Sequence, residues 1–263
     1  MSRSFSGILF DLDGVLVTGG NPLPGAMETL QTLRDAGIPF LILSNMTLAP
    51  RAAVLDRFRR AGLDLPLDTM LTPPAAAARW LRVQGDHPAA LFVAPATRVE
   101  FTGLNLLPDD AERGAEFVVI GDMGDEWNAR QLNRALRLLL DGARLVTLGM
   151  GRYWMAPDGI RLDNGAYASA LAYASSQEPI VIGKPSPDYF QMALEMLGLP
   201  PEQVAMVGDD ILNDVDAAQK LGMQGILVQT GKFRPEDLQQ DVTPNKVLPG
   251  VAHILSLLHL QPD

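Results

Sequence analysis

The segment 8–14 reads Ile-Leu-Phe-Asp-Leu-Asp-Gly, a short apolar run that ends in a pair of carboxylates. The run is short enough for a buried strand. Phe40–Leu43 repeats the pattern and is followed by Ser44. Val204–Val207 repeats it again, shortly before Asp209. Helical stretches separate these runs, so the sequence predicts a doubly wound α/β fold, a parallel sheet with helices on both faces.

The same alternation continues along most of the chain. The predicted strands are Ile8–Phe10, Phe40–Leu43, Thr69–Leu71, Ala90–Val93, Phe117–Ile120, Leu145–Leu148, Ile180–Ile182, Val204–Val207 and Gly225–Val228. The predicted helices are Pro24–Ala36, Ala49–Ala61, Ala75–Val83, a helix through Leu132–Leu140, Asp188–Leu197 and Asp214–Leu221. In Leu132–Leu140 the apolar residues recur at helical spacing, which gives the helix one apolar face.

Composition excludes several classes of protein. The net charge of −10 argues against a nucleic-acid partner, which needs a basic face. There is no cysteine, so disulfides and thiolate chemistry are excluded and a reducing compartment is expected. The sequence shows neither the apolar core of a signal peptide nor an apolar stretch of about 20 residues. We therefore expect a cytoplasmic protein without a membrane partner.

Polar side chains follow four of the predicted strands. They are Asp11 with Asp13, Ser44 with Asn45, Lys184, and Asp209 with Asp210. Ligands of open parallel sheets bind at the carboxyl ends of the strands, near the point where the strand order reverses. We therefore expect these residues to converge on one site.

The residue types suit phosphoryl transfer. An aspartate that attacks a phosphoryl group meets an anion with an anion, so the site must neutralise charge. Asp11 and Asp209 offer the oxygen ligands that Mg²⁺ prefers, and Lys184 adds a second positive charge. Asp13, two residues after Asp11, is placed to protonate a leaving oxygen and later to accept a proton from water.

The motifs resemble those of the haloacid-dehalogenase superfamily. They are Asp-Leu-Asp-Gly-Val-Leu (11–16), Leu-Ser-Asn (43–45), Gly-Lys-Pro (183–185) and Gly-Asp-Asp with a further carboxylate, Asp214. The Asp-x-Asp form is that of the phosphatases and phosphotransferases of the superfamily, and the true dehalogenases lack the second aspartate. The resemblance therefore implies a Rossmann-like core and a Mg²⁺-dependent phosphatase acting on a small phosphorylated metabolite.

Carried onto this chain, the resemblance implies a role for each motif residue. Asp11 is the expected nucleophile and a metal ligand, and Asp13 the general acid/base, whose backbone carbonyl also binds the metal. The remaining residues divide into phosphate ligands, a metal ligand and supporting carboxylates. The phosphate ligands are Ser44, Asn45 and Lys184. The metal ligand is Asp209, and the supporting carboxylates are Asp210 and Asp214.

The spacing of the motifs indicates where a second domain is inserted. Asp13 and Ser44 are 31 positions apart, and Ser44 and Lys184 are 140 apart, which is more than the core needs. We predict a catalytic core of residues 1–72 and 177–263 and an inserted α/β cap of residues 73–176. This arrangement is that of the NagD-like branch, with a cap of the second type. Segments 138–143, 152–154 and 230–235 resemble the phospholysine phosphohistidine inorganic pyrophosphate phosphatases and their relatives.

Other interpretations stay open at this level. A phosphotransferase or mutase would use the same motifs, and a non-enzymatic phosphate-binding scaffold would require one to be missing. Within the cap, Arg152, Tyr153 and Trp154 are expected in a loop, where they either read the substrate or fill the cap core. The acidic run Asp122–Glu126 is expected to be a solvated turn. The chain is compatible with a homo-oligomer.

Overall fold

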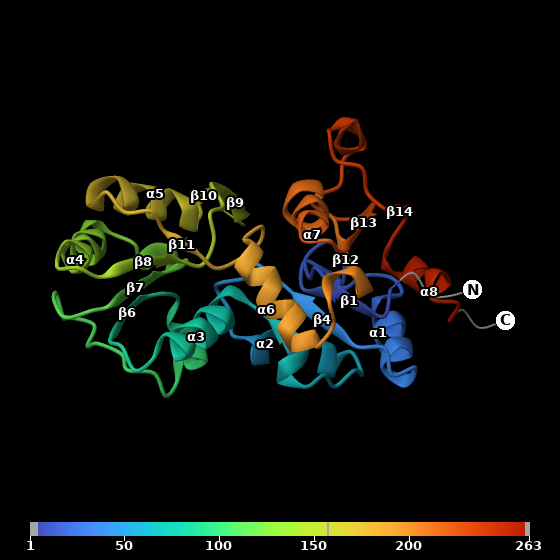
Figure 1. Cartoon of the computed structure of the whole chain (residues 1–263), viewed down its shortest axis with the longest axis horizontal. Coiled ribbons are helices and arrows are strands. Elements are labelled where there is room, and N and C mark those ends of the chain that lie inside the picture. The colour runs from blue at the N-terminus through green and yellow to red at the C-terminus, as the bar shows by residue number, and fades with distance from the viewer. Residues whose placement is uncertain (1–4, 157, 261–263) are drawn as a thin grey trace. The chain divides into compact units, whose positions relative to one another are not determined.

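The computed structural model describes residues 5–156 and 158–260, and the chain divides into two compact units. One contains Met1–Ser44, Arg51–Leu71 and Lys184–Asp263, and is called the core unit below. The other contains Asn45–Pro50 and Thr72–Gly183, and is called the inserted unit. Figure 1 shows the elements of each unit.

The core unit is organised around a parallel sheet (Figure 1). Its strands, in spatial order, are β14 (Lys246–Leu248), β13 (Gln224–Val228), β12 (Val204–Gly208), β1 (Gly7–Phe10), β4 (Phe40–Leu43) and β5 (Met70–Leu71). Every neighbouring pair in this sheet is parallel. The predicted fold class is therefore confirmed.

The position of β1 fixes where the site lies. From β1 the chain adds β4 and β5 on one side, and later adds β12, β13 and β14 on the other. The strand order therefore reverses between β1 and β12, which is where ligands bind in open α/β sheets. Both strands are completely buried, as expected for apolar runs covered on both faces.

Helices and a short hairpin complete the core unit. The helices are α1 (Ala26–Asp35), α2 (Arg51–Arg60), α6 (Pro187–Leu197), α7 (Ala217–Lys220) and α8 (Ile254–Leu257). Strands β2 (Val17–Thr18) and β3 (Asn21–Pro22) form an antiparallel pair directly after the first motif. Gly37, at φ +66°, follows α1 in the left-handed conformation that ends many helices.

The inserted unit has its own parallel sheet and helices. The strands, in spatial order, are β11 (Ile180–Val181), β8 (Arg144–Thr147), β7 (Phe117–Ile120) and β6 (Ala89–Phe92). The helices are α3 (Pro73–Gln84), α4 (Ala129–Leu140) and α5 (Asn164–Ser175). Strands β9 (Tyr153–Ala156) and β10 (Gly159–Leu162) form a separate antiparallel hairpin.

Alternate residues of β7 face different helices. Val118 and Ile120 pack in one buried cluster with Leu138 of α4 and Leu171 of α5. On the other side, Phe117 meets the edge of Trp80 of α3, with 5.1 Å between ring centroids. The sheet is therefore covered on both faces, as a parallel sheet requires. The Asn128 side chain caps α4 by accepting hydrogen bonds from two backbone N–H groups.

Two expectations about the course of the chain were wrong, and one strand was missed. The strand near Ile180 was expected in the core, but β11 pairs with β8 and so belongs to the inserted unit. An apolar run that short does not reveal which sheet it joins. Residues 153 and 154 were expected in a loop and lie instead in β9. The edge strand β14 was not predicted, because Lys246–Leu248 is short and begins with a charge.

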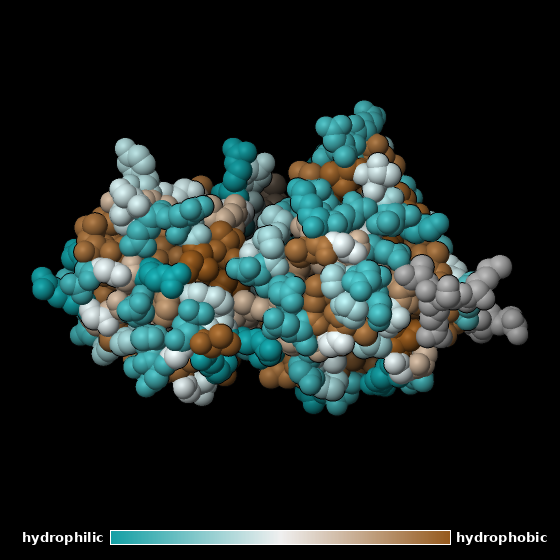
Figure 2. Space-filling view, viewed as in Figure 1, coloured by the Kyte–Doolittle hydropathy of each residue, from teal (hydrophilic) through white to brown (hydrophobic). Residues whose placement is uncertain are grey.

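On the one face that Figure 2 shows, the described residues are largely polar. Hydrophilic residues cover much of each unit on that face, and smaller hydrophobic patches interrupt them within each unit. Within the part of the chain that the structure describes, every helix is too short or too polar to traverse a lipid bilayer.

Candidate active site

The first feature of the site is a set of side chains presented by three strand ends. Asp11 directly follows β1, and its backbone N–H donates to the carbonyl of Val207 in β12 at 2.9 Å. Ser44 follows β4 and donates its backbone N–H to the carbonyl of Leu71 at 3.1 Å. Asp209 follows β12. The ladder thus continues one residue beyond β1 and β4, which fixes the direction in which Asp11 and Ser44 emerge.

Lys184 joins two of the carboxylates. Its Nζ donates to Oδ1 of Asp11 at 2.6 Å and to Oδ1 of Asp214 at 2.7 Å, and all three residues are buried. Burial alone would lower the pKa of Lys184, but the two carboxylates outweigh it and raise that pKa above its ordinary value. The lysine is therefore a fixed positive charge next to Asp11.

Asp209 lies in a cradle formed by two glycines. A Cβ atom at Gly14 or at Gly231 would overlap Oδ2 of Asp209, and both glycines have positive φ, +85° and +62°. The backbone N–H of Lys232 donates to the same Oδ2 at 2.6 Å. The other oxygen, Oδ1, is buried and has no hydrogen-bond partner among the described residues. A buried carboxylate oxygen that has no hydrogen-bond partner needs a ligand to offset the free-energy cost of its burial.

The carboxylates carry more negative charge than Lys184 can balance. Asp11, Asp209 and Asp214 each place an oxygen within 4.8 Å of the others. Burial, followed by repulsion from Asp11, raises the pKa of Asp209 to about 6. Burial, with Asp11 also contributing, raises the pKa of Asp214 to about 7. The donor set is therefore suited to a hard divalent cation, which would reverse both shifts.

Asp214 differs from the other two carboxylates. Its Oδ1 accepts from Lys184, and its Oδ2 accepts from the backbone N–H of Asp210 at 3.2 Å. A Cβ at Gly208 would overlap the Asp214 side chain, so a glycine is needed at the end of β12. With both of its oxygens engaged, Asp214 holds Lys184, and Asp11 and Asp209 are left to bind a cation.

Asp13 is the exposed member of the first motif. The protein atoms around its carboxyl, and then the charge of Asp11, raise the pKa of Asp13, whereas Lys184 and Lys232 act to lower it. A carboxyl with a raised pKa and access to solvent is suited to exchanging protons.

Asp210 organises the backbone beyond β12. Its Oδ1 accepts from the N–H groups of Leu212 and Asn213, at 3.2 and 3.0 Å, so it caps the helical turn Ile211–Asp216. Burial acts to raise the pKa of Asp210, but the hydrogen bonds from Asn213 and Leu212, together with Lys232, hold it below its ordinary value. Its role is structural in this geometry.

The predicted phosphate ligands Ser44 and Asn45 differ in their burial and in the unit to which they belong. Ser44 is buried, and the hydroxyl of Tyr189 in α6 donates to its backbone carbonyl at 2.7 Å. Burial and the neighbouring charge of Asp11 raise the pKa of Tyr189 well above its ordinary value, so it remains a hydrogen-bond donor. Asn45 is exposed and begins the short segment Asn45–Pro50, which belongs to the inserted unit.

Sequence reasoning missed three residues that shape the core site. Gly231 and Lys232 secure Asp209, and Tyr189 secures Ser44. The segment Thr230–Pro235 was noted only for its resemblance to relatives. Its position directly after the strand β13 was the signal that could have assigned it to the site. Tyr189 gave no signal beyond its place in an apolar helix face.

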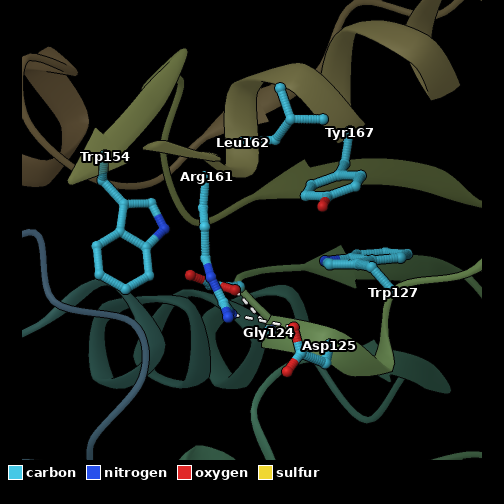
Figure 3. A pocket seen from close by; sticks show the side chains of 8 residues that line it. Gly124, Asp125, Trp127, Trp154, Arg161, Leu162 and Tyr167 are labelled. Carbon is cyan, nitrogen blue, oxygen red and sulfur yellow. Dashed lines mark hydrogen bonds and ion pairs between the residues drawn. The ribbon is translucent and has the colours of Figure 1, made fainter. Parts of the chain in front are cut away.

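The inserted unit contains a separate hollow (Figure 3). Trp154 is half-buried and lines it, whereas Arg152 and Tyr153 are exposed. Asp122 also lines it and is buried, so the expectation that this residue belongs to a solvated turn was wrong. Burial raises the pKa of Asp122. The sequence around Asp122 did not distinguish a buried acid from its exposed neighbours.

Comparisons with known proteins agree with this geometry. The family model for haloacid dehalogenase-like hydrolases matches residues 8–106, and a second model, HAD-hydrolase-like, matches residues 181–254. The phospholysine phosphohistidine inorganic pyrophosphate phosphatase of Xenopus laevis is 33% identical over 98% of this chain and 93% of its own.

Solved structures give the same result. The p-nitrophenyl phosphatase of Archaeoglobus fulgidus matches with a TM-score of 0.88 at 29% identity, covering 96% of this chain and 99% of its own. NagD of Escherichia coli K-12 matches with a TM-score of 0.84 at 26% identity, covering 95% and 98%. The chain belongs to the haloacid dehalogenase-like hydrolases, in their NagD-like branch, and is a phosphoric monoester hydrolase.

Proposed function

We propose that the protein is a Mg²⁺-dependent phosphatase that hydrolyses a small phosphate monoester through a phosphorylated Asp11. One observation carries the proposal: Asp11 lies where the strand order reverses, ion-paired to buried Lys184, and the nearby Asp209 has an unpartnered oxygen. A nucleophile, a fixed cation and an incomplete cation site are the parts that phosphoryl transfer requires.

Asp11, Asp209 and the backbone carbonyl of Asp13 would hold the Mg²⁺. When bound, the ion supplies positive charge that offsets the carboxylates and the phosphoryl oxygens. The fit rests on the buried Oδ1 of Asp209 and on the excess of carboxylates over cations around it.

In the first step a carboxylate oxygen of Asp11 forms a bond to phosphorus, and the bond from phosphorus to the ester oxygen breaks. Asp13 donates its proton to that leaving oxygen. Lys184 and Ser44, with the amide of Asn45, would hold the phosphoryl oxygens. Because the raised pKa of Lys184 keeps its charge throughout, this contact does not depend on solvent pH near neutrality.

In the second step water attacks the phosphorus of the aspartyl-phosphate. Asp13, now deprotonated, accepts a proton from that water, the bond to Asp11 breaks, and inorganic phosphate leaves. Asp11 returns to a carboxylate, so the cycle closes without any other reactant. Asp13 is suited to both transfers because its pKa is raised.

We further propose that the inserted unit acts as a cap that selects the substrate. The core residues named above bind only the phosphoryl group, so the leaving group must be recognised by other residues. Arg152, Tyr153 and Trp154 are the candidates, and a small phosphorylated metabolite is the expected substrate. The name of the Xenopus laevis relative admits phosphoramidates and pyrophosphate to the set of compounds to be tested.

Turnover of p-nitrophenyl phosphate, with Mg²⁺ and then with excess EDTA, tests the proposal. We expect turnover that EDTA abolishes and added Mg²⁺ restores. Turnover unaffected by EDTA would contradict the metal requirement. Release of p-nitrophenol in excess of inorganic phosphate when an acceptor alcohol is added would instead identify a phosphotransferase.

A further inference from the structure

A hollow of about 350 Å³ lies within the inserted unit, lined by residues outside the four motifs. Its volume is near the lower end of the ~300–1,000 Å³ typical of small-molecule sites. Figure 3 shows the Trp154 indole on one side and the rings of Trp127 and Tyr167 on the other, with Arg161 between them. These residues come from β9, β10, the start of α5 and the segment before α4.

The aromatic wall of the hollow is rigid and largely apolar. Tyr167 stacks on Trp127 with 4.8 Å between ring centroids, and Trp127 stacks in turn on buried Phe92 at 6.0 Å. The indole N–H of Trp127 donates to the carbonyl of Gly121 at 3.1 Å, so this donor is already used. The wall therefore offers an occupant its aromatic surface and the Tyr167 hydroxyl, but not the indole N–H of Trp127.

Arg161 forms its ion pairs with acids other than Asp122. Its Nε and Nη2 donate to the two oxygens of Asp158 at 3.0 and 2.6 Å, and its Nη1 donates to Asp125 at 3.0 Å. One guanidinium thus faces two carboxylates, which form a bidentate pair and a single ion pair with it.

Asp122 is the unmatched acid of the hollow. It is 6% exposed, its Oδ1 accepts from the N–H of Gly124 at 2.7 Å, and it forms no ion pair within the described part of the chain. Burial, with Asp163 adding repulsion, raises the pKa of Asp122 despite opposing contributions from Gly124, Arg161 and Trp154. The hollow therefore combines aromatic walls with a buried carboxylate that forms no ion pair among the described residues, although the charge of Arg161 reaches it.

We propose that this hollow binds a small organic cation, an ammonium or a guanidinium, through Asp122 and the Trp154 ring. Desolvated ammonium groups gain from both a carboxylate and an aromatic face. A metal ion is a poorer fit, because the closely spaced carboxylates that could hold one, among the residues described, are those of the core unit. The cation is borne either by the phosphate ester itself or by a separate molecule.

Binding of n-butylammonium to the full chain tests the proposal, with n-butanol as the neutral probe of equal size. Two of the three tryptophans line the hollow, so their fluorescence reports binding alongside calorimetry. We expect saturable binding of the amine, about tenfold tighter than of the alcohol, and about a tenfold loss in Asp122→Asn. Asp86→Asn, an exposed acid of the same unit, is the matched control and should bind as the wild type does.

Equal binding of amine and alcohol, or unchanged amine binding in folded Asp122→Asn, would overturn the proposal. Should Asp122→Asn fail to fold, Trp154→Leu replaces it. Loss of the ring should weaken amine binding about threefold or more, and undiminished binding would again overturn it. Asp11→Asn should bind the amine normally, so this measurement does not depend on phosphatase activity.

Two further measurements identify where the cation comes from, and both rest on the proposed function because both follow turnover of a phosphate ester. If the substrate bears it, wild type should favour O-phosphoethanolamine over ethyl phosphate in kcat/KM, and Asp122→Asn should lose that preference. If it is a separate molecule, n-butylammonium should change the turnover of p-nitrophenyl phosphate in wild type but not in Asp122→Asn. Either result supports the proposal. Absence of both, together with absence of binding, contradicts it.

Discussion

The core unit and the inserted unit share a parallel sheet covered by helices, yet they present polar side chains in different ways. In the core unit, Asp11, Ser44 and Asp209 each follow a buried strand directly. In the inserted unit, the polar and aromatic groups of the hollow come from a hairpin, a helix start and a loop. The polar groups of the candidate active site thus lie at strand ends, which hold them in place, whereas the hollow is lined from elements of several kinds.

The largest effect is expected from removal of the nucleophile at the end of β1. Asp11→Asn should reduce kcat by more than about 10³-fold, because an amide is not a nucleophile and binds Mg²⁺ poorly. Steady-state turnover of p-nitrophenyl phosphate measures the loss, and the melting temperature establishes that the variant is folded. The matched control is Asp68→Asn, an exposed acid of the core unit. Activity above a hundredth of wild type, without deamidation, would contradict the assignment.

The second prediction concerns the exposed aspartate of the same motif. Asp13→Asn should slow turnover by about 10²–10⁴-fold, since it removes proton transfer but leaves Asp11 and Lys184 in place. Single-turnover formation of the intermediate should suffer less with aryl phosphates, whose leaving groups need little protonation, than with alkyl phosphates. Equal losses for the two classes would show that Asp13 is not the acid.

A third variant tests the glycine cradle of Asp209. In Gly231→Ala the new Cβ would overlap Oδ2 of Asp209, so the carboxylate must shift. We expect the Mg²⁺ concentration for half-maximal activity to rise about tenfold, a loss of about 1.4 kcal/mol in binding.

Gly37→Ala is the matched control for that variant. Gly37 has a similar φ of +66°, and its Cβ would meet nothing within 4 Å. Both variants carry the backbone strain of a positive φ, so both should lose some stability. A shift in Mg²⁺ dependence of equal size in the two variants would mean that the cradle does not act through Asp209.

The smallest expected effect is a link between pH and Mg²⁺. The pKa of Asp209 and that of Asp214 are raised to about 6 and about 7, so the metal-free folded state holds protons that the unfolded state has released. The metal-free protein should therefore lose stability from this site as pH rises from about 4 through 7. Mg²⁺ replaces those protons, so it should stabilise the protein more at high pH.

Thermal melts with saturating Mg²⁺ or with EDTA measure this link. At pH 7.5 we expect Mg²⁺ to raise the melting temperature by about 5 °C, and at pH 5.5 by clearly less. Asp209→Asn should remove most of the difference. A Mg²⁺ effect that is larger at pH 5.5 than at pH 7.5 would contradict the sign of the pKa shifts.

The sequence predicted the buried strands of both units better than the short or exposed ones for a physical reason. Phe40–Leu43 and Phe117–Ile120 are confirmed as strands with the predicted bounds, because fully buried strands are continuous apolar runs. Strand β14 is short, begins with a charge and is largely exposed, and β11 is a half-buried apolar run too short to reveal which sheet it joins. The former was missed, and the latter was assigned to the wrong sheet.

Prediction of the candidate site from the sequence was limited in a similar way. Asp11, Asp209 and Lys184 could be named because each is part of a short contiguous motif. The support that Gly231 and Tyr189 provide depends on contacts between segments distant in the chain, and neither residue type indicates such a contact. The burial of Asp122 is likewise set by tertiary packing, since its neighbour Asp125 has the same charge and is exposed.

Trapping the phosphorylated enzyme tests whether Asp11 is the nucleophile. Asp13→Asn should form the aspartyl-phosphate and hydrolyse it slowly, so the intermediate should accumulate when p-nitrophenyl phosphate and Mg²⁺ are added. Acid quenching, borohydride reduction and peptide mass spectrometry would then locate the modified residue. We expect modification of Asp11, and none in the Asp11→Asn, Asp13→Asn double variant. Modification of another residue, or turnover without any modified peptide, would contradict it.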